Sequence, residues 1–130
     1  MPLLNYDFAN TPEIKPLPAG EYYVILRSLE ETTSKSSGAP MLKAHLEIED
    51  APFANDVFHN IMLPAPTDTT KDAARKVNRL RDFVTVFGGS TSGPVDTATL
   101  IGSRALVRLK FTSDPQFGDK NEVEAWLRPA

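Results

Sequence analysis

Four side chains near the end of the chain have the types and spacing that suit contact with a nucleic-acid strand. Residues 104–128 read as a β-hairpin, in which alternate side chains face the core and the solvent. We expect the core-facing set to be Ala105, Val107, Leu109 and Phe111 on one strand and Val123, Ala125 and Leu127 on the other. The solvent-facing set then includes Arg108, Lys110, Trp126 and Arg128. Cations can follow a phosphate backbone, and an exposed tryptophan offers a face on which bases stack.

An exposed tryptophan needs an explanation, because burying one stabilises a protein substantially. Base stacking on Trp126 is one explanation, and contact with a second copy in a homodimer is another. Glu122 and Glu124 share the outward face of the hairpin. They can pair with Arg108 and Lys110, which would leave an ordinary row of surface ion pairs.

The elements upstream must position this hairpin. Residues 1–19 contain four prolines, which favours an extended lead-in. Strands are expected over residues 20–32, 41–49 and 56–63, each bounded by turn-forming residues. The second strand alternates cleanly, and its inward residues are Leu42, Ala44, Leu46 and Ile48.

A helix is expected after the third strand. Thr69 or Thr70 can cap its N-terminus, and Gly88-Gly89 ends it. Apolar residues recur at steps of three and four and form one face, made of Ala73, Val77, Leu80, Val84 and Phe87. Between Thr70 and Gly88, five cations outnumber two carboxylates, a net charge of +3. They form a secondary basic patch of Lys71, Arg75, Lys76 and Arg79, with Arg81 beside them, for which a solvated helix face is the alternative.

The order of three strands, one helix and two strands restricts the topology. It is the order of the oligonucleotide/oligosaccharide-binding (OB) fold, a five-stranded, partly open Greek-key barrel, and two-layer α+β sheets share it. The 130 residues suffice for one domain with a real core. We predict an all-β fold with one helix between strands three and four, as a single OB-fold domain over residues 20–130 after the 1–19 lead-in.

Further candidate contacts follow from this fold. The loops after the first and fourth strands of such barrels extend over the bound strand, which predicts contacts from Lys35 and Phe117. The first three strands form the usual ligand face, and their candidates are Arg27, Lys43, Phe58 and Asn60. A position in the core is the alternative for Phe58, and a side chain folded back onto the barrel is the alternative for Phe117. An ordinary surface position is the alternative for Arg27, Lys43 and Asn60.

Charge and composition narrow the class of protein. The net charge is −3, but residues 1–69 stand at −6 and residues 70–130 at +3, so a polyanion should meet the second half. No apolar run is long enough for a membrane helix, and the first residues lack a secretion signal. The chain has no cysteine, which excludes disulfides and thiolate metal sites. We expect a cytoplasmic protein without membrane contact.

Three segments of the chain together resemble a phage-encoded family of single-stranded DNA-binding proteins. The segments are residues 16–48, with Pro16-Leu-Pro-Ala-Gly-Glu-Tyr-Tyr-Val-Ile25; the basic helix ending Phe87-Gly-Gly89; and residues 100–123, with Asp114-Pro-Gln-Phe-Gly-Asp-Lys-Asn-Glu-Val123. The resemblance implies an OB fold and sequence-non-specific binding of single-stranded DNA in the host cell cytoplasm. It also implies phage replication or recombination enzymes as partners.

The sequence lacks the motifs that are typical of a catalytic site. His45 and His59 are the only histidines, and neither stands in a metal-ligand spacing with another ligand. No phosphate-binding loop or nucleophile elbow occurs. We expect no enzyme activity, cofactor or metal. The alternative function is an OB-like protein-interaction or virion structural module, which oligomerises through Trp126, Leu106 and the lead-in and does not bind nucleic acid.

Overall fold

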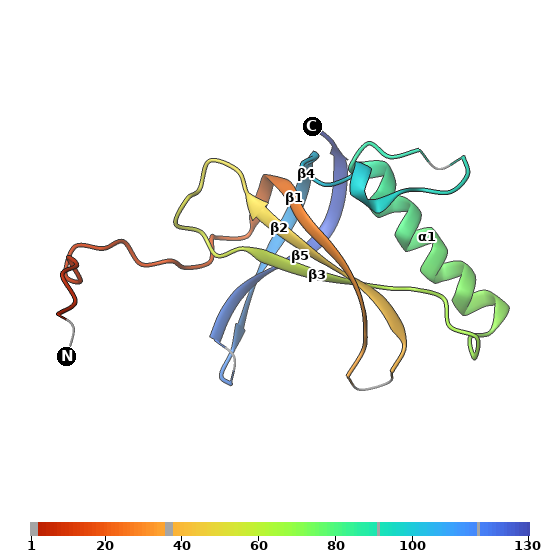
Figure 1. The fold of residues 1–130 in the computed structure, drawn as a ribbon, viewed down its shortest axis with the longest axis horizontal. Coiled ribbons are helices and arrows are strands. Elements are labelled where there is room, and N and C mark those ends of the chain that lie inside the picture. Colours follow the sequence, from red (N-terminus) through yellow and green to blue (C-terminus); the bar gives the residue numbers. More distant parts are fainter. Residues whose placement is uncertain (1–2, 36–37, 91, 117) are drawn as a thin grey trace.

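The computed structural model describes residues 3–35, 38–90, 92–116 and 118–130. The predicted order of three strands, a helix and two strands is confirmed (Figure 1). A short 3₁₀ turn, η1 (Thr97–Thr99), lies between the helix and the last two strands. The other elements are β1 (Gly20–Thr33), β2 (Pro40–Ile48), β3 (Val57–Met62), α1 (Thr70–Val86), β4 (Arg104–Asp114) and β5 (Gly118–Pro129).

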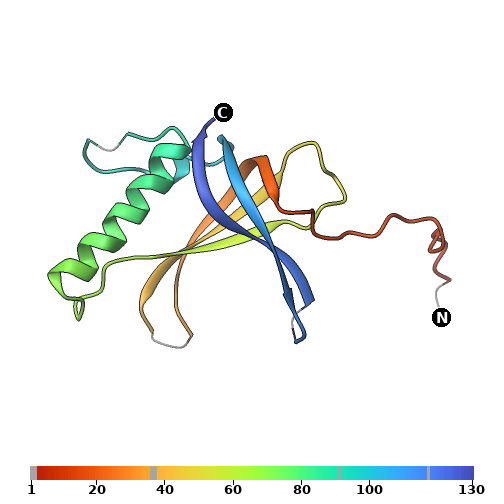
Figure 2. The same ribbon diagram turned by 180° about the vertical axis from the view of Figure 1, so that it is seen from behind.

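The five strands form one antiparallel sheet in the order β3-β2-β1-β4-β5. The sheet is strongly twisted, so its two edge strands curve toward each other, as Figures 1 and 2 show from opposite sides. His59 of β3 and Trp126 of β5 meet edge to face, with ring centroids 5.1 Å apart. β3 and β5 are not neighbours in the ladder of the described residues, so the sheet is barrel-like but not closed.

The core lies inside the curled sheet and follows the predicted alternation on β2. Val24 and Leu26 are fully buried on β1. The four predicted inward residues of β2 are all buried, namely Leu42, Ala44, Leu46 and Ile48. The β1–β2 register shifts between Leu26 and Ser28, so Arg27 is an extra residue that forms a β-bulge. After the bulge, Leu29 lies on the inner face, opposite the buried Ala44.

The outward position predicted for Trp126 is wrong. The register of β4 and β5 shifts twice, so that Glu124 and Leu127 are extra residues on β5. Each such bulge reverses the alternation of the residues that follow it. Trp126 therefore lies opposite the fully buried Val107, and Ala125, predicted inward, lies opposite the exposed Arg108.

The indole of Trp126 packs in an aromatic cluster with the end of α1. Its ring centroid is 5.3 Å from that of Phe83 and 5.8 Å from that of Phe87, both in edge-to-face geometry. Phe83 is fully buried and Phe87 nearly so. Trp126 is thus part of the contact between the helix and the sheet.

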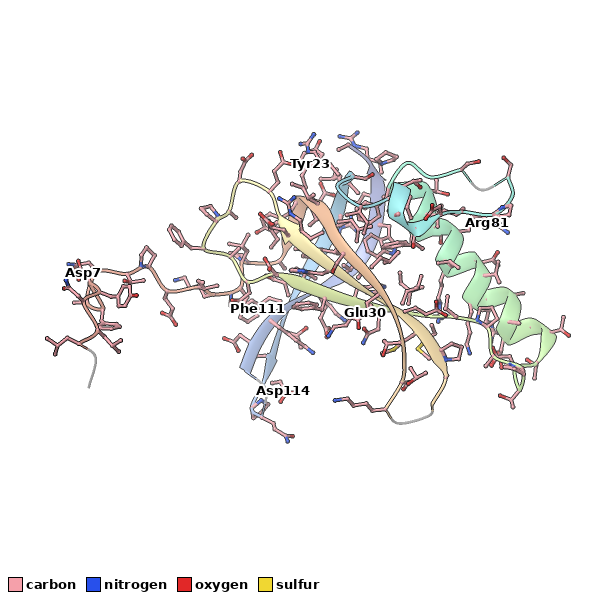
Figure 3. All side chains as sticks on the ribbon, viewed as in Figure 1. Asp7, Tyr23, Glu30, Arg81, Phe111 and Asp114 are labelled. Carbon is pink, nitrogen blue, oxygen red and sulfur yellow. The ribbon has the colours of Figure 1, made fainter. Side chains whose placement is uncertain are left out.

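Two other predicted core positions are also wrong. Phe111, labelled in Figure 3, is 45% exposed, because it lies beyond the part of β4 that covers the core. Val77 is 43% exposed, because only the C-terminal half of α1 packs on the sheet. The N-terminal half of the helix extends away from the strands (Figure 1).

Both ends of α1 form as the sequence predicts. The Thr69 hydroxyl accepts a hydrogen bond from the Asp72 N–H at 3.2 Å and caps the helix. Gly88 has φ of 78°, a conformation that favours glycine. Gly89 then passes so close to Val84 and Leu100 that a Cβ atom would lie under 3 Å from both side chains. The chain can therefore leave the helix and stay against the core.

The last part of the lead-in is fixed to the sheet. Asn121, the buried polar side chain of β5, accepts a hydrogen bond from the Leu17 N–H at 2.9 Å and donates to the Leu17 carbonyl at 2.8 Å. Lys15 exchanges backbone hydrogen bonds with Phe53 and Asn55. Within the described part of the chain, no helix is long and apolar enough to cross a membrane.

Candidate nucleic-acid interface

Two adjoining hollows form a groove that crosses β3. One, of about 540 Å³, lies over the ends of β1, β2 and β3, and the other, of about 600 Å³, lies between β3 and the β4–β5 hairpin. Lys43 and Asn60 line both hollows, which makes them continuous. The β1–β2 and β4–β5 hairpins project on the same side of the sheet and flank the groove (Figure 1). We name this the β3 groove, defined by Lys35, Lys43, Phe58, Asn60, Lys110 and Lys120.

Phe58 provides an aromatic face in the middle of the β3 groove. Phe58 is 54% exposed, whereas its neighbour Val57 is fully buried. This exposure excludes the core position that was the alternative for Phe58. The ring stacks on the His45 imidazole, with centroids 4.8 Å apart and planes at 14°. His45 is held in turn by Asp56, with Nε2 and Oδ2 2.7 Å apart. Phe58 is therefore a supported, solvent-facing ring, which suits base stacking.

Lys43 places a positive charge beside that ring. Its Nζ lies 5.1 Å from the Phe58 ring centroid, within the range of a cation–π interaction. Lys35 lies at the far end of the groove, next to the β1–β2 turn. Among the ion pairs of the described residues, neither lysine has a carboxylate partner, so neither ammonium is held in a close ion pair.

The hairpin wall of the groove carries a partly neutralised charge. The Glu122 carboxylate lies 3.5 Å from Lys110 Nζ and 3.1 Å from Lys120 Nζ, and it accepts a hydrogen bond from Thr112. The Lys120 ammonium, which hydrogen-bonds this carboxylate, lowers the pKa of Glu122. The predicted surface pairing of Lys110 with Glu122 is thus confirmed, and the two lysines leave one net positive charge on this wall.

Two further carboxylates line the groove. The Asp56 carboxylate is paired with His45, and Glu30 of β1 lies opposite Lys43 in the β1–β2 register and lines the same hollow. His59 is half-buried beside Trp126, and burial lowers the pKa of its imidazole below the ordinary 6.5. His59 is therefore neutral at pH 7 and contributes no charge to the groove.

Four predicted contact residues do not line the β3 groove, namely Arg27, Arg108, Trp126 and Arg128. Arg27 is paired with Glu47 at 2.7 Å, and Arg108 is paired with Glu21 of β1 at 3.4 Å. Arg128 is exposed near the C-terminal end of β5, where it lines a separate small hollow with Trp126. Phe117 lies outside the described residues.

The secondary basic patch on α1 is largely paired or distant from the groove. Lys76 Nζ is 2.9 Å from the Asp68 carboxylate, and Arg75 is 3.3 Å from Asp72. Lys71 is exposed on the first turn of the helix, and Arg79 lines a hollow between α1, β3 and β5. The patch therefore borders the β3 groove only through Arg79.

Two residues of the site were not identified from the sequence. Lys120 lies on the outward face of β5 two positions before Glu122, so continuing the alternation toward the turn would have found it. His45 was expected to face outward, which is confirmed, but its role as a support for the Phe58 ring needs the β2–β3 register that places the two residues opposite each other.

The comparisons with known proteins place the chain in a family without assigning a role. Residues 4–123 match a family described as a protein of unknown function, DUF669, and the chain belongs to this family. No curated protein matches the chain. The described residues contain no cluster of three or more potential metal ligands. The chemistry that the site offers is therefore an aromatic face with cations along a groove.

Proposed function

We propose that the chain is a non-enzymatic, sequence-non-specific single-stranded DNA-binding protein with an OB fold, which supports phage DNA replication and recombination. The observation that carries the proposal is the Phe58 ring, exposed in the β3 groove and flanked by the unpaired Lys43. Stacking on such a ring is tolerant of sequence because every base has a π-face.

The topology supports the OB assignment. The sheet order β3-β2-β1-β4-β5, with the helix between β3 and β4, is what remains when such a barrel is open between β3 and β5. Ligands of OB folds bind across the second and third strands, between the loops that follow the first and fourth strands. The β3 groove is lined by β2, β3 and the β1–β2 and β4–β5 hairpins, which are the corresponding strands and loops of this chain.

The exposed aromatic ring favours a single strand as the ligand. Bases must leave the duplex to stack on a protein ring, and Phe58 lines the hollow between β3 and the β4–β5 hairpin. Lys35, Lys43 and the hairpin lysines lie along the groove on both sides of the ring, where they can contact successive phosphates.

Fluorescence anisotropy with a labelled oligo-dT, repeated with a labelled duplex of mixed sequence, tests the proposal. We expect saturable binding of the single strand, weaker binding of the duplex and a steep loss of affinity with added salt. Oligo-dT and an unstructured mixed-sequence strand should bind with similar affinity. Absence of single-strand binding at low salt would refute the proposal and favour the protein-interaction module.

A further inference from the structure

The N-terminal arm, residues 3–14, leaves the sheet with its apolar side chains in solvent. Its large apolar residues are between 62% and 95% exposed, namely Leu3, Leu4, Tyr6, Phe8 and Ile14. The Tyr6 and Phe8 rings touch edge to face, with centroids 6.1 Å apart, and form one aromatic unit. Large apolar side chains gathered on one exposed segment are typical of an interaction site.

The opposite end of the molecule has an apolar cleft without an occupant. The cleft, of about 370 Å³, lies between α1, the inner ends of β1 and β2, and the segment after the helix. Its apolar lining includes Leu29, Leu42, Val77, Leu80, Val95 and Leu100. Val77, on the part of α1 that extends beyond the sheet, is 43% exposed there. Its size is within the range of ~300–1,000 Å³ in which clefts hold ligands.

Charge favours the arm as the occupant of this cleft. Residues 3–14 carry Asp7 and Glu13 and no cation, a net charge of −2, whereas residues 70–88 carry a net charge of +3. Arg81 also lines the cleft. The arm therefore brings apolar side chains and an opposite charge to the same place.

The geometry excludes a short path from the arm to the cleft of its own chain. Lys15 and Leu17 are hydrogen-bonded to the sheet, which fixes the root of the arm. From there the arm runs away from α1, and Asp7 and Arg81 lie at opposite ends of the longest axis (Figure 3). Figures 1 and 2 show the same separation from both sides.

We propose that the N-terminal arm of one copy docks in the α1 cleft of a second copy. The two surfaces are different, so the contact is head-to-tail and can continue from copy to copy in an open chain. The β3 groove takes no part in the contact, so this self-association is independent of nucleic-acid binding.

Site-specific cross-linking tests this contact, because the chain has no cysteine of its own. Full-length Phe8→Cys and Val77→Cys chains are mixed and treated with a short bismaleimide. We expect a cross-linked pair that contains one chain of each kind. The matched control mixes Phe53→Cys with Val77→Cys, because Phe53 is an exposed phenylalanine outside the arm, 52% exposed against 69% for Phe8. Cross-linking no stronger than in this control would overturn the proposal.

A chain that carries both Phe8→Cys and Val77→Cys distinguishes the two possible arrangements. Head-to-tail docking predicts a ladder of dimers and larger species from this variant. Exclusive cross-linking within single chains, at a protein concentration where the wild type associates, would show that the arm occupies its own cleft and would overturn the proposal.

Sedimentation velocity over a concentration series provides a measurement without cysteines. We expect wild-type association that becomes at least about tenfold weaker in Phe8→Ser and in Val77→Glu, but not in Phe53→Ser. A wild type that stays monomeric throughout would contradict the proposal. Single-strand binding by isolated copies should survive in Phe8→Ser, so failure of the contact and failure of the proposed function give different results.

Discussion

The two sides of the opening between β3 and β5 use their aromatic residues in opposite ways. On the groove side, Phe58 is 54% exposed and stacks on a histidine, with a lysine above it. On the helix side, Trp126 is covered by Phe83 and Phe87. Trp126 thus stabilises the fold, and Phe58 is available to a ligand.

The cations follow this division in part. Lys35 and Lys43, in the groove, have no carboxylate partner among the described ion pairs, whereas Arg75, Lys76 and Arg108, outside it, are each paired. On the hairpin wall of the groove, Lys110 and Lys120 share the Glu122 carboxylate. A paired surface cation has already lost part of its attraction for a phosphate. The number of cations on a surface is therefore a poorer guide to a binding site than their pairing.

The largest expected effect of a single substitution is a loss of stability on the helix side. Phe83→Ala removes a fully buried ring from the cluster around Trp126 and should lower the free energy of unfolding by about 3–5 kcal/mol. Urea unfolding followed by Trp126 fluorescence measures it. Phe58→Ala is the matched control and should change stability far less. Equal losses from the two variants would contradict the division between the two sides.

The next effect is on the groove side. Phe58→Ala removes the stacking surface and should weaken oligo-dT binding by about 1–3 kcal/mol without unfolding the protein. Anisotropy titrations at one fixed salt concentration measure the loss. Phe111→Ala is the control, because Phe111 is similarly exposed but does not line the groove. If both variants bind as the wild type does, Phe58 is not the stacking residue.

A smaller effect separates unpaired from paired cations. Lys43→Gln removes one expected phosphate contact and should reduce the slope of log K against log salt by about 0.7. Arg108→Gln removes a cation that is already paired with Glu21 and should leave the slope unchanged. Titrations at several salt concentrations compare the two. A larger change in Arg108→Gln would move the interface to the outer face of β4.

The smallest effect is a pH dependence of stability through His59. Burial lowers the pKa of His59 in the folded state below 6.5, so near pH 6 the unfolded chain binds more protons than the folded chain. The contribution of the neutral His59 to the free energy of unfolding is fully present above pH 6.5. It is lost as the pH falls toward the folded-state pKa of His59. His59→Gln should therefore show a flatter decline of unfolding free energy between pH 7 and pH 5. An unchanged decline would show that His59 is freely protonated in the opening.

Much of the fold could be predicted from periodicity, because β2 and the helix follow one face without interruption. The caps at Thr69 and Gly88 were likewise predictable from residue type. The two bulges on β5 could not be predicted, because an extra residue leaves no mark in composition. Because of these bulges, Trp126 lies on the inner face instead of the predicted outer face. The exposed aromatic ring of the site is therefore Phe58 and not Trp126.

The candidate site was predictable in part. Lys35, Lys43, Phe58, Asn60 and Lys110 were selected from the sequence, and the structure brings all five to one groove. Burial of Val57 and Ile61 leaves Phe58 and Asn60 on the outer face, whereas the sequence alone allowed a core position for Phe58. Pairing of Arg27 and Arg108 was not predictable, because it depends on registers between separate strands.

Ultraviolet cross-linking of oligo-dT to the wild-type protein, with the cross-linked peptides identified by mass spectrometry, tests the central claim most directly. The proposal predicts that cross-links concentrate on β3 at Phe58, with others on the groove-facing parts of β2 and the β4–β5 hairpin, and that a short strand leaves Trp126 unmodified. Cross-links confined to Trp126 or to α1 would contradict the assignment of the β3 groove as the nucleic-acid interface.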